Sequence, residues 1–208
     1  VELLGLGTAA LRKLPVQADF TLDLAALQSA ITADRAAGCR PICVIGSAGT
    51  VNTGAIDNLD ALADLCAREG LWFHVDGAYG GFAILTPGGR EAFRGIESAD
   101  SVTLDPHKWL FQPYETGCLM VRDTRVLEGA FRILPEYLQD ADLGREHVNF
   151  ADRGVQLSRR FRALKVWMSI QMLGLGAFRE AIAGSMALAL RAERYIQESP
   201  VLELAAPA

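Results

Sequence analysis

The chain has 208 residues, of which 50% are hydrophobic and 22% are charged, a balance typical of a soluble globular protein. Its formal net charge of −5, with acidic and basic residues mixed along the chain, argues against nucleic acid or an anionic membrane as the main partner. The sequence shows no signal peptide and no apolar run of the roughly 18 residues that a membrane span needs. We therefore expect a cytoplasmic protein without a membrane partner.

The four cysteines show no metal-binding spacing. Cys39 and Cys43 lie four residues apart, but no second ligand pair follows, and Cys66 and Cys118 complete no Cys/His cluster. Structural zinc sites use four ligands in such pairs, so we expect no metal. Reduced and mostly buried thiols in a cytosolic protein are the simpler interpretation.

The two ends of the chain predict a fragment of a larger protein. Residues 1–7 are typical of the last turns of a helix, and residues 201–208 of the first strand of a further unit. Between them, we expect a helix over 23–38, ending in glycine, and a buried strand over 41–46.

Residues 57–70 predict an amphipathic helix. Its core leucines and Cys66 recur at helical spacing and therefore fall on one face. Asp57 is expected to cap the start of this helix, and Gly70 to end it.

Three further strands are expected over 71–76, 101–105 and 117–122. Strands and helices that alternate at this spacing imply βαβ units, hence an α/β fold with a mostly parallel sheet flanked by helices. The last two strands are joined by a short non-helical link, so we expect them to pair antiparallel.

The remainder of the chain has a different character. A helix is expected over 124–132, and residues 133–154 predict a long loop of the kind that often serves as a lid or binding segment. Residues 158–199 predict two helices that are broken near a Gly-Leu-Gly sequence. Methionine and aromatic residues recur at helical spacing over 161–178, and we expect them to be buried in the core.

Polar residues follow three of the predicted strands. In an open α/β sheet, ligands bind beyond the carboxyl ends of the strands. If the strands are parallel neighbours, Thr50, Asp76, His107 and Lys108 meet at one edge. A lysine and a carboxylate in such a place are candidates for functional groups.

Lys108 is one of only three lysines, beside 17 arginines. A lysine in a dry site loses its proton readily and can form a Schiff base with an aldehyde. Pyridoxal 5′-phosphate (PLP) uses this chemistry and needs an acid group opposite its pyridine nitrogen, a role for which Asp76 is the candidate. The small residues Gly77 and Ala78 leave space for a ring.

Two motifs resemble those of one family. The segments NTGAIDNLDALADLCAREGLWFHVDGAYGG and ADSVTLDPHKWL, followed by QLSRRFRALKVW, closely resemble the PLP-dependent group II amino acid decarboxylases, which include the aromatic-L-amino-acid, histidine and glutamate enzymes. The resemblance covers nearly the whole chain. It implies the large domain of a fold-type I PLP-dependent transferase.

The resemblance also implies roles for individual residues. Lys108 corresponds to the lysine that bonds to the cofactor, and Asp76 to the partner of the pyridinium nitrogen. Ala78 corresponds to the residue against the ring face, and His107 to the histidine beside the lysine, near phosphate and substrate.

One further residue and one loop border the cofactor in the resemblance. Asp105 lies near the phosphate, where relatives carry asparagine or aspartate. Thr50, Val51 and Asn52 lie on a loop beside the cofactor, and Thr50 is the better candidate for a polar contact.

One departure from the family concerns the last proton transfer. In the family, a tyrosine on the mobile loop is thought to protonate the carbanion left by CO₂, and this chain carries Phe150 at the corresponding place. Phenylalanine cannot donate a proton, and relatives with this change can react with oxygen and release an aldehyde. His147 or Tyr137 are alternative donors.

The resemblance implies decarboxylation of an L-amino acid to an amine and CO₂ by a homodimer. The alternatives are an aldehyde-forming oxidative deaminase, a fold-type I lyase of the cysteine desulfurase or sphingosine-phosphate lyase kind, and an inactive scaffold fragment. The chain is expected to have three parts. Residues 1–132 would form part of the PLP-binding large domain, and residues 133–157 a mobile catalytic-loop region. Residues 158–208 would continue as helices into a truncated small domain.

Three residues near these motifs have less specific interpretations. His74 lies two residues before Asp76 on the same strand, so both side chains point to one face. It is either a core histidine or a support for Asp76. Arg159 and Arg160 are expected to begin a helix and to form structural salt bridges.

Overall fold

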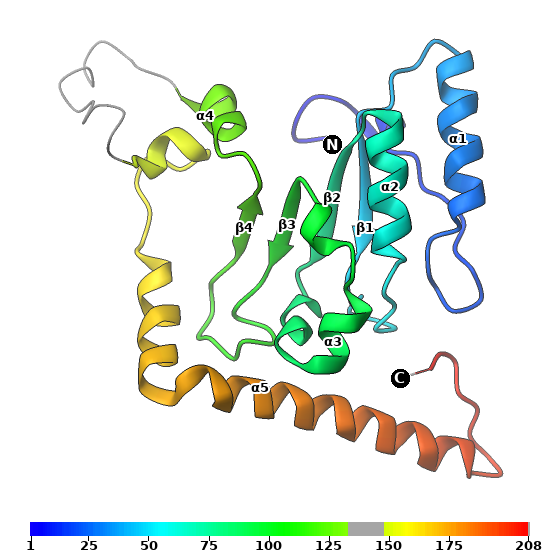
Figure 1. Cartoon of the computed structure of the whole chain (residues 1–208), viewed down its shortest axis with the longest axis vertical. Coiled ribbons are helices and arrows are strands. Elements are labelled where there is room, and N and C mark those ends of the chain that lie inside the picture. Colours follow the sequence, from blue (N-terminus) through cyan, green and yellow to red (C-terminus); the bar gives the residue numbers. More distant parts are fainter. Residues whose placement is uncertain (133–147, 208) are drawn as a thin grey trace.

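The computed structural model describes residues 1–132 and 148–207 (Figure 1). A four-stranded sheet with the order β1-β2-β3-β4 lies at its centre. The first three strands are parallel and β4 is antiparallel to β3, as expected. Their bounds are Cys43–Ser47 for β1, Trp72–Gly77 for β2, Ser101–Leu104 for β3 and Cys118–Val121 for β4.

Helices cover one face of this sheet. Helix α2 (Leu59–Glu69) packs on β1 and β2, and α1 (Leu24–Ala36) lies beside it in Figure 1. The predicted apolar face of α2 is buried and packs with Phe73 and Val75 of β2. Burying these side chains is the main source of stability for this part of the fold.

The side chains of β2 alternate between two environments. Phe73 and Val75 are buried in the core, whereas His74 is partly exposed and Asp76 exposed on the opposite face. This alternation follows from the two-residue period of a strand. It turns the polar residues of β2 away from α2.

The prediction that Asp57 caps α2 is wrong. The helix is capped by Asn58, whose side chain accepts a hydrogen bond from Ala61 N. Asp57 instead accepts from Leu22 N and Ser47 N, both at 2.7 Å, and is 7% exposed. The Asp57 carboxylate therefore binds backbone groups outside α2 and does not cap the helix. Gly70 ends α2 in the left-handed region, as expected.

We expect Asp57→Ala to lower the free energy of unfolding by about 3 kcal/mol, because it removes two charge-assisted hydrogen bonds and leaves two backbone N–H groups without partners. Urea titration followed by circular dichroism measures the change. Asp64→Ala, at an exposed position of α2, is the matched control and is expected to change stability by less than about 0.5 kcal/mol. Equal losses in both variants would contradict the structural role given to Asp57.

Neither end of the chain forms the element expected of it. Residues 1–7 form turns, followed by the 3₁₀ helix η1 (Thr8–Ala10), because Gly5 and Gly7 adopt positive φ values of 74° and 76°. Residues 201–207 form no strand. No neighbouring strand within the described residues pairs with them.

Further helical segments lie between the core and the C-terminal helix. The 3₁₀ helices η2 (Gly81–Leu85) and η3 (Ile96–Ser98) flank α3 (Pro87–Ala92), and α4 (Arg125–Phe131) confirms the helix expected there. The predicted loop over 133–154 contains the 3₁₀ helix η5 (Phe150–Arg153), and its residues 133–147 lie outside the described part.

Helix α5 (Arg162–Gln197) is broken at Gly174, whose φ of 75° and ψ of 152° are not helical. Figure 1 shows the resulting corner in the orange helix, and the predicted break is confirmed. The helix begins after Arg159 and Arg160, not at them, because Phe161 is its N-cap.

Most of the apolar side chains expected to be buried in α5 are exposed. Phe178 is buried, but Trp167 and Met172 are exposed, because no described element packs on their face of the helix. Within the described residues, α5 is also long and apolar enough to cross a membrane by length and composition, which the sequence expectation overlooked. A single helix of this kind is weak evidence for a membrane span, and no membrane role follows.

The expectation of mostly buried thiols is also wrong. Cys66 is buried, and this burial raises the pKa of its thiol to about 11. The other three cysteines are exposed, with Cys43 and Cys118 on strand faces that α2 does not cover. All four thiols are free.

Candidate active site

Three loops meet at the carboxyl edge of the parallel strands. Asp76 lies at the end of β2, and Asp105 directly follows β3, its parallel neighbour. The backbone of Ala48, just beyond β1, donates to the carbonyl of Asp76 at 2.8 Å. The sequence prediction that these strand ends share one edge is therefore confirmed.

A tight turn after β3 gathers three of the predicted residues. Lys108 N donates to the Asp105 carbonyl at 2.9 Å, and Lys108 Nζ lies 2.8 Å from Asp105 Oδ2. His107 Nε2 is 3.9 Å from the same carboxylate oxygen. The Lys108 side chain is 36% exposed, so its amine is held by a carboxylate yet remains accessible.

His107 is fixed by the link between β3 and β4. Its Nδ1 lies 2.6 Å from the Thr116 carbonyl and 3.0 Å from the Thr116 amide nitrogen. The ring of Tyr114 meets the imidazole edge-on, with 4.7 Å between centroids. These contacts turn the Nε2 side of the ring toward Asp105.

Asp76 and Ala78 are joined by a local hydrogen bond. Ala78 N donates to Asp76 Oδ1 at 3.0 Å, which orients the carboxylate at the end of β2. Gly77 between them is tightly packed, since an added Cβ would lie 3.2 Å from the Thr103 carbonyl. Because the Asp76 carboxylate is exposed, it can accept a hydrogen bond from a bound molecule.

The loop that carries Thr50 rests on the turn after β2. Gly80 N donates to Gly49 O at 3.1 Å, and a Cβ on Gly49 would lie 2.8 Å from Gly80 Cα. Only glycine allows this close approach at the φ of 82° seen for Gly49. The Thr50 hydroxyl bonds to that of Thr53 at 2.8 Å, so it serves the loop itself.

The structure brings some predicted residues into contact and leaves others separate. Asp105, His107 and Lys108 form one cluster, and Asp76 pairs with Ala78. Within residues 1–132 and 148–207, no hydrogen bond or ion pair joins Asp76 to Lys108. A molecule that bridges them would have to contact both strand ends.

The sequence analysis named His74 but did not predict the polar network that it joins on β2 and β3. His74 bonds to the hydroxyls of Ser101 and Thr103, and Trp72 Nε1 donates to Ser101 Oγ. All four side chains lie on the face of the sheet that carries Asp76. The alternation of polar residues along β2 and β3 contained this signal, but the partners depend on the register between the strands.

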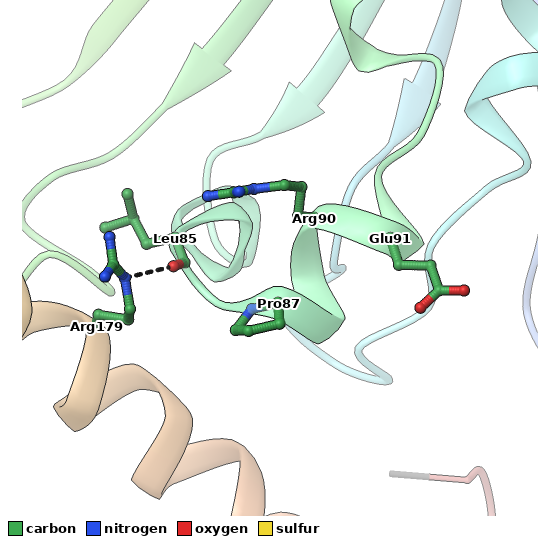
Figure 2. Close-up of a pocket in the computed structure, with 5 residues that line it drawn as sticks. All are labelled: Leu85, Pro87, Arg90, Glu91 and Arg179. Carbon is green, nitrogen blue, oxygen red and sulfur yellow. Dashed lines mark hydrogen bonds between the residues drawn. The ribbon is translucent and has the colours of Figure 1, made fainter.

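A pocket of about 530 Å³ lies between η2, α3 and α5 (Figure 2). Arg179 Nε donates to the Leu85 carbonyl at 2.9 Å, as Figure 2 shows, and holds α5 against η2. None of the predicted site residues lines this cavity. Its lining residues are Leu85, Pro87, Arg90, Glu91 and Arg179.

The chain is similar to known proteins in both sequence and structure. The sequence model of the family described as "Pyridoxal-dependent decarboxylase conserved domain" matches residues 2–207. The chain is 47% identical to an aromatic-L-amino-acid decarboxylase of Bacillus atrophaeus over 188 residues, which are 90% of this chain and 39% of the relative.

Two solved structures are similar over the full chain. The structure of Oryza sativa TDC with PLP and tryptamine has a TM-score of 0.93 and 37% identity, and 43% of that chain is covered. The structure of Rhodiola rosea 4-hydroxyphenylacetaldehyde synthase has a TM-score of 0.89 and 30% identity, and 42% of that chain is covered. The present chain thus spans about two fifths of the relatives it matches.

Proposed function

Because this chain belongs to the pyridoxal-dependent decarboxylase family, we propose that the whole protein removes the α-carboxylate of an L-amino acid as CO₂ and releases an amine. The observation that carries the proposal is the turn of Asp105, His107 and Lys108 after β3, beside Asp76 at the end of β2. The cofactor of the family is PLP, and the fold is the mostly parallel α/β sheet of fold-type I enzymes, as expected.

The groups at this edge fit the cofactor chemically. PLP supplies an aldehyde that bonds to amines and a ring that takes up the electron pair left when CO₂ departs. Lys108 provides the accessible amine that would bond to the aldehyde, and Asp76 provides an exposed carboxylate to hold a proton on the ring nitrogen. Ala78 is small enough to lie against a ring beside Asp76.

The remaining predicted residues would support these two. Asp105 holds the Lys108 amine at 2.8 Å, which would keep it in place whenever the substrate occupies the aldehyde. His107 is fixed through Thr116, with its Nε2 toward Asp105. Its proposed place is near the phosphate and the substrate. We place Thr50 at the border of the cofactor, on a loop that is packed against the turn after β2.

An aromatic L-amino acid is the proposed substrate, and the support for it is the similarity to the Bacillus atrophaeus enzyme. A cytoplasmic homodimer is the proposed form of the protein. The exposed apolar side chains of α5, among them Trp167 and Met172, support a protein partner on that helix.

Supplying the purified protein with PLP and a panel of L-amino acids tests this function. We expect CO₂ and the corresponding amine in equal amounts from an aromatic substrate, together with an absorbance band from protein-bound PLP. PLP binding without CO₂ release from any amino acid would contradict the proposal.

A second function, decarboxylation coupled to oxidative deamination, is favoured by Phe150. This side chain is 62% exposed on η5 and has no hydroxyl. From the family resemblance, we assign Phe150 to the position of the loop tyrosine. Arg159 fixes it by bonding to the Phe150 carbonyl and lying over its ring, 5.3 Å from the centroid. The alternative donors Tyr137 and His147 lie outside the described residues.

In this second function, substrate and O₂ would give an aldehyde, CO₂, ammonia and hydrogen peroxide, with water as co-reactant. The similarity to the Rhodiola rosea aldehyde synthase supports it. Without a proton donor at position 150, the carbanion would persist long enough to transfer electrons to oxygen.

Phe150→Tyr is therefore expected to raise the ratio of amine to aldehyde by about tenfold or more, because the added phenol can donate a proton. CO₂, peroxide, aldehyde and amine are measured in one reaction. Phe161→Tyr adds the same hydroxyl at another exposed phenylalanine and is the control. An unchanged product ratio in Phe150→Tyr would contradict the role given to this position.

A further inference from the structure

His74 is held at both ring nitrogens by residues of the neighbouring strand. Its Nδ1 lies 2.8 Å from Ser101 Oγ, and its Nε2 lies 3.1 Å from Thr103 Oγ1. Thr103 is also the residue that pairs with Asp76 in the register of β2 and β3. The imidazole therefore spans the surface that leads to the Asp76 carboxylate.

Trp72 and Ser101 indicate which atoms donate and which accept in this network. An indole N–H can only donate, so Trp72 Nε1 donates to Ser101 Oγ at 2.8 Å. Ser101 is 7% exposed, and its single hydroxyl proton needs an acceptor, which His74 Nδ1 provides. With Ser101 as the donor to Nδ1, a neutral imidazole carries its proton on Nε2, where Thr103 Oγ1 can accept it.

The charge of His74 agrees with this arrangement. Burial lowers the pKa of His74, and this effect outweighs the carboxylate of Asp76, which raises it. Cys43 on β1 is the titratable neighbour that touches the His74 backbone. A neutral imidazole leaves the negative charge of Asp76 free for a cation from outside the chain.

We propose that His74 is a positioning residue for Asp76, held as the neutral Nε2–H tautomer by Ser101 and Thr103. The inference rests on the proposed function, because the cation that Asp76 would meet is the protonated ring nitrogen of PLP. The hydrogen bond from His74 fixes the orientation of the Thr103 hydroxyl. Thr103 pairs with Asp76 in the register of β2 and β3, so this hydroxyl would otherwise rotate freely beside the carboxylate. An imidazolium at this place would instead compete for the carboxylate.

Nuclear magnetic resonance of the PLP-free protein tests the tautomer without relying on activity. With ¹⁵N-labelled histidine, we expect His74 to give the shifts of a neutral ring protonated at Nε2, from pH 8 down to below its ordinary pKa of about 6.5. The chain has only three histidines, and a His74→Gln spectrum assigns the signal. A ring protonated at Nδ1, or charged at pH 7, would overturn the proposal.

Matched variants test the effect on Asp76. His74→Leu cannot bond to Ser101 or Thr103 and is expected to weaken PLP binding about tenfold and lower kcat with little change in KM. His74→Gln keeps an N–H donor for Thr103 and is expected to recover most of both losses. Thr103→Val removes the same hydrogen bond from the other side, and circular dichroism confirms folding in each case.

The outcomes separate this proposal from the proposed function. PLP binding by the natural protein with unchanged affinity and kcat in His74→Leu and Thr103→Val would overturn the role of His74 alone. A natural protein that binds no PLP would contradict the proposed function, while the tautomer measurement would still decide the state of His74.

Discussion

Lys108→Ala is expected to abolish covalent attachment of PLP and to lower kcat/KM by about 10⁴-fold or more, because no other amine lies in the turn after β3. The absorbance band of the protein–PLP adduct would disappear with it. A spectrum and a CO₂ assay on the same preparation measure both effects.

Two variants control this experiment. Lys108→Arg keeps the positive charge beside Asp105 but not the nucleophilic amine, so we expect it to be as inactive as Lys108→Ala. Lys13→Ala removes an exposed lysine elsewhere and is expected to retain full activity. Substantial activity in Lys108→Arg would show that charge, and not a covalent bond, is what position 108 supplies.

Asp76→Asn is expected to lower kcat by about 10³-fold, because an amide cannot hold a proton on the ring nitrogen through charge. The geometry at the end of β2 should survive, since the asparagine oxygen can still accept from Ala78 N. Steady-state kinetics and PLP binding are measured together. Asp76→Glu keeps the charge on a longer side chain and is expected to lose less activity.

Asp64→Asn is the matched control for this loss, since Asp64 is exposed on α2, which carries none of the proposed site residues. We expect its kinetics to equal those of the natural protein. If Asp76→Asn kept the kcat of the natural protein, the carboxylate would have no role in storing the electron pair, and the site assignment would need another acid.

The pH dependence of stability offers a further check on the β2–β3 network. Because the pKa of His74 is lowered by folding, the unfolded chain binds the proton more readily. The contribution of this residue to stability is therefore present above about pH 6.5 and declines as the pH falls below it. In His74→Gln this part of the acid-induced loss is expected to be absent in urea titrations from pH 7.5 to 5.

Local sequence patterns predicted the parts of the fold that depend on neighbouring residues. The apolar spacing of α2, its glycine end at Gly70 and the break at Gly174 each need only a few adjacent residues. The cluster of Asp105, His107 and Lys108 was predictable for the same reason, since one turn of backbone carries all three side chains.

Features that depend on tertiary contacts were not predictable in this way. Asp57 has the local chemistry of a helix cap, but its carboxylate accepts hydrogen bonds from the backbone of Leu22 and Ser47. Leu22 is distant in the sequence, and Ser47 lies on β1. The partners of His74 follow from a register that places it opposite Ser101. The exposure of Trp167 depends on which element packs against α5, and no periodicity in that helix contains this information.

Reduction of the PLP-loaded protein with borohydride, followed by peptide mass mapping, tests the central claim most directly, because it fixes the covalent bond at the residue that forms it. The chain offers three candidate lysines, Lys13, Lys108 and Lys165. We expect the added pyridoxyl phosphate mass on the peptide that contains Lys108 and on neither of the others. A label on Lys13 or Lys165, or none on Lys108 in a protein that holds PLP, would contradict it.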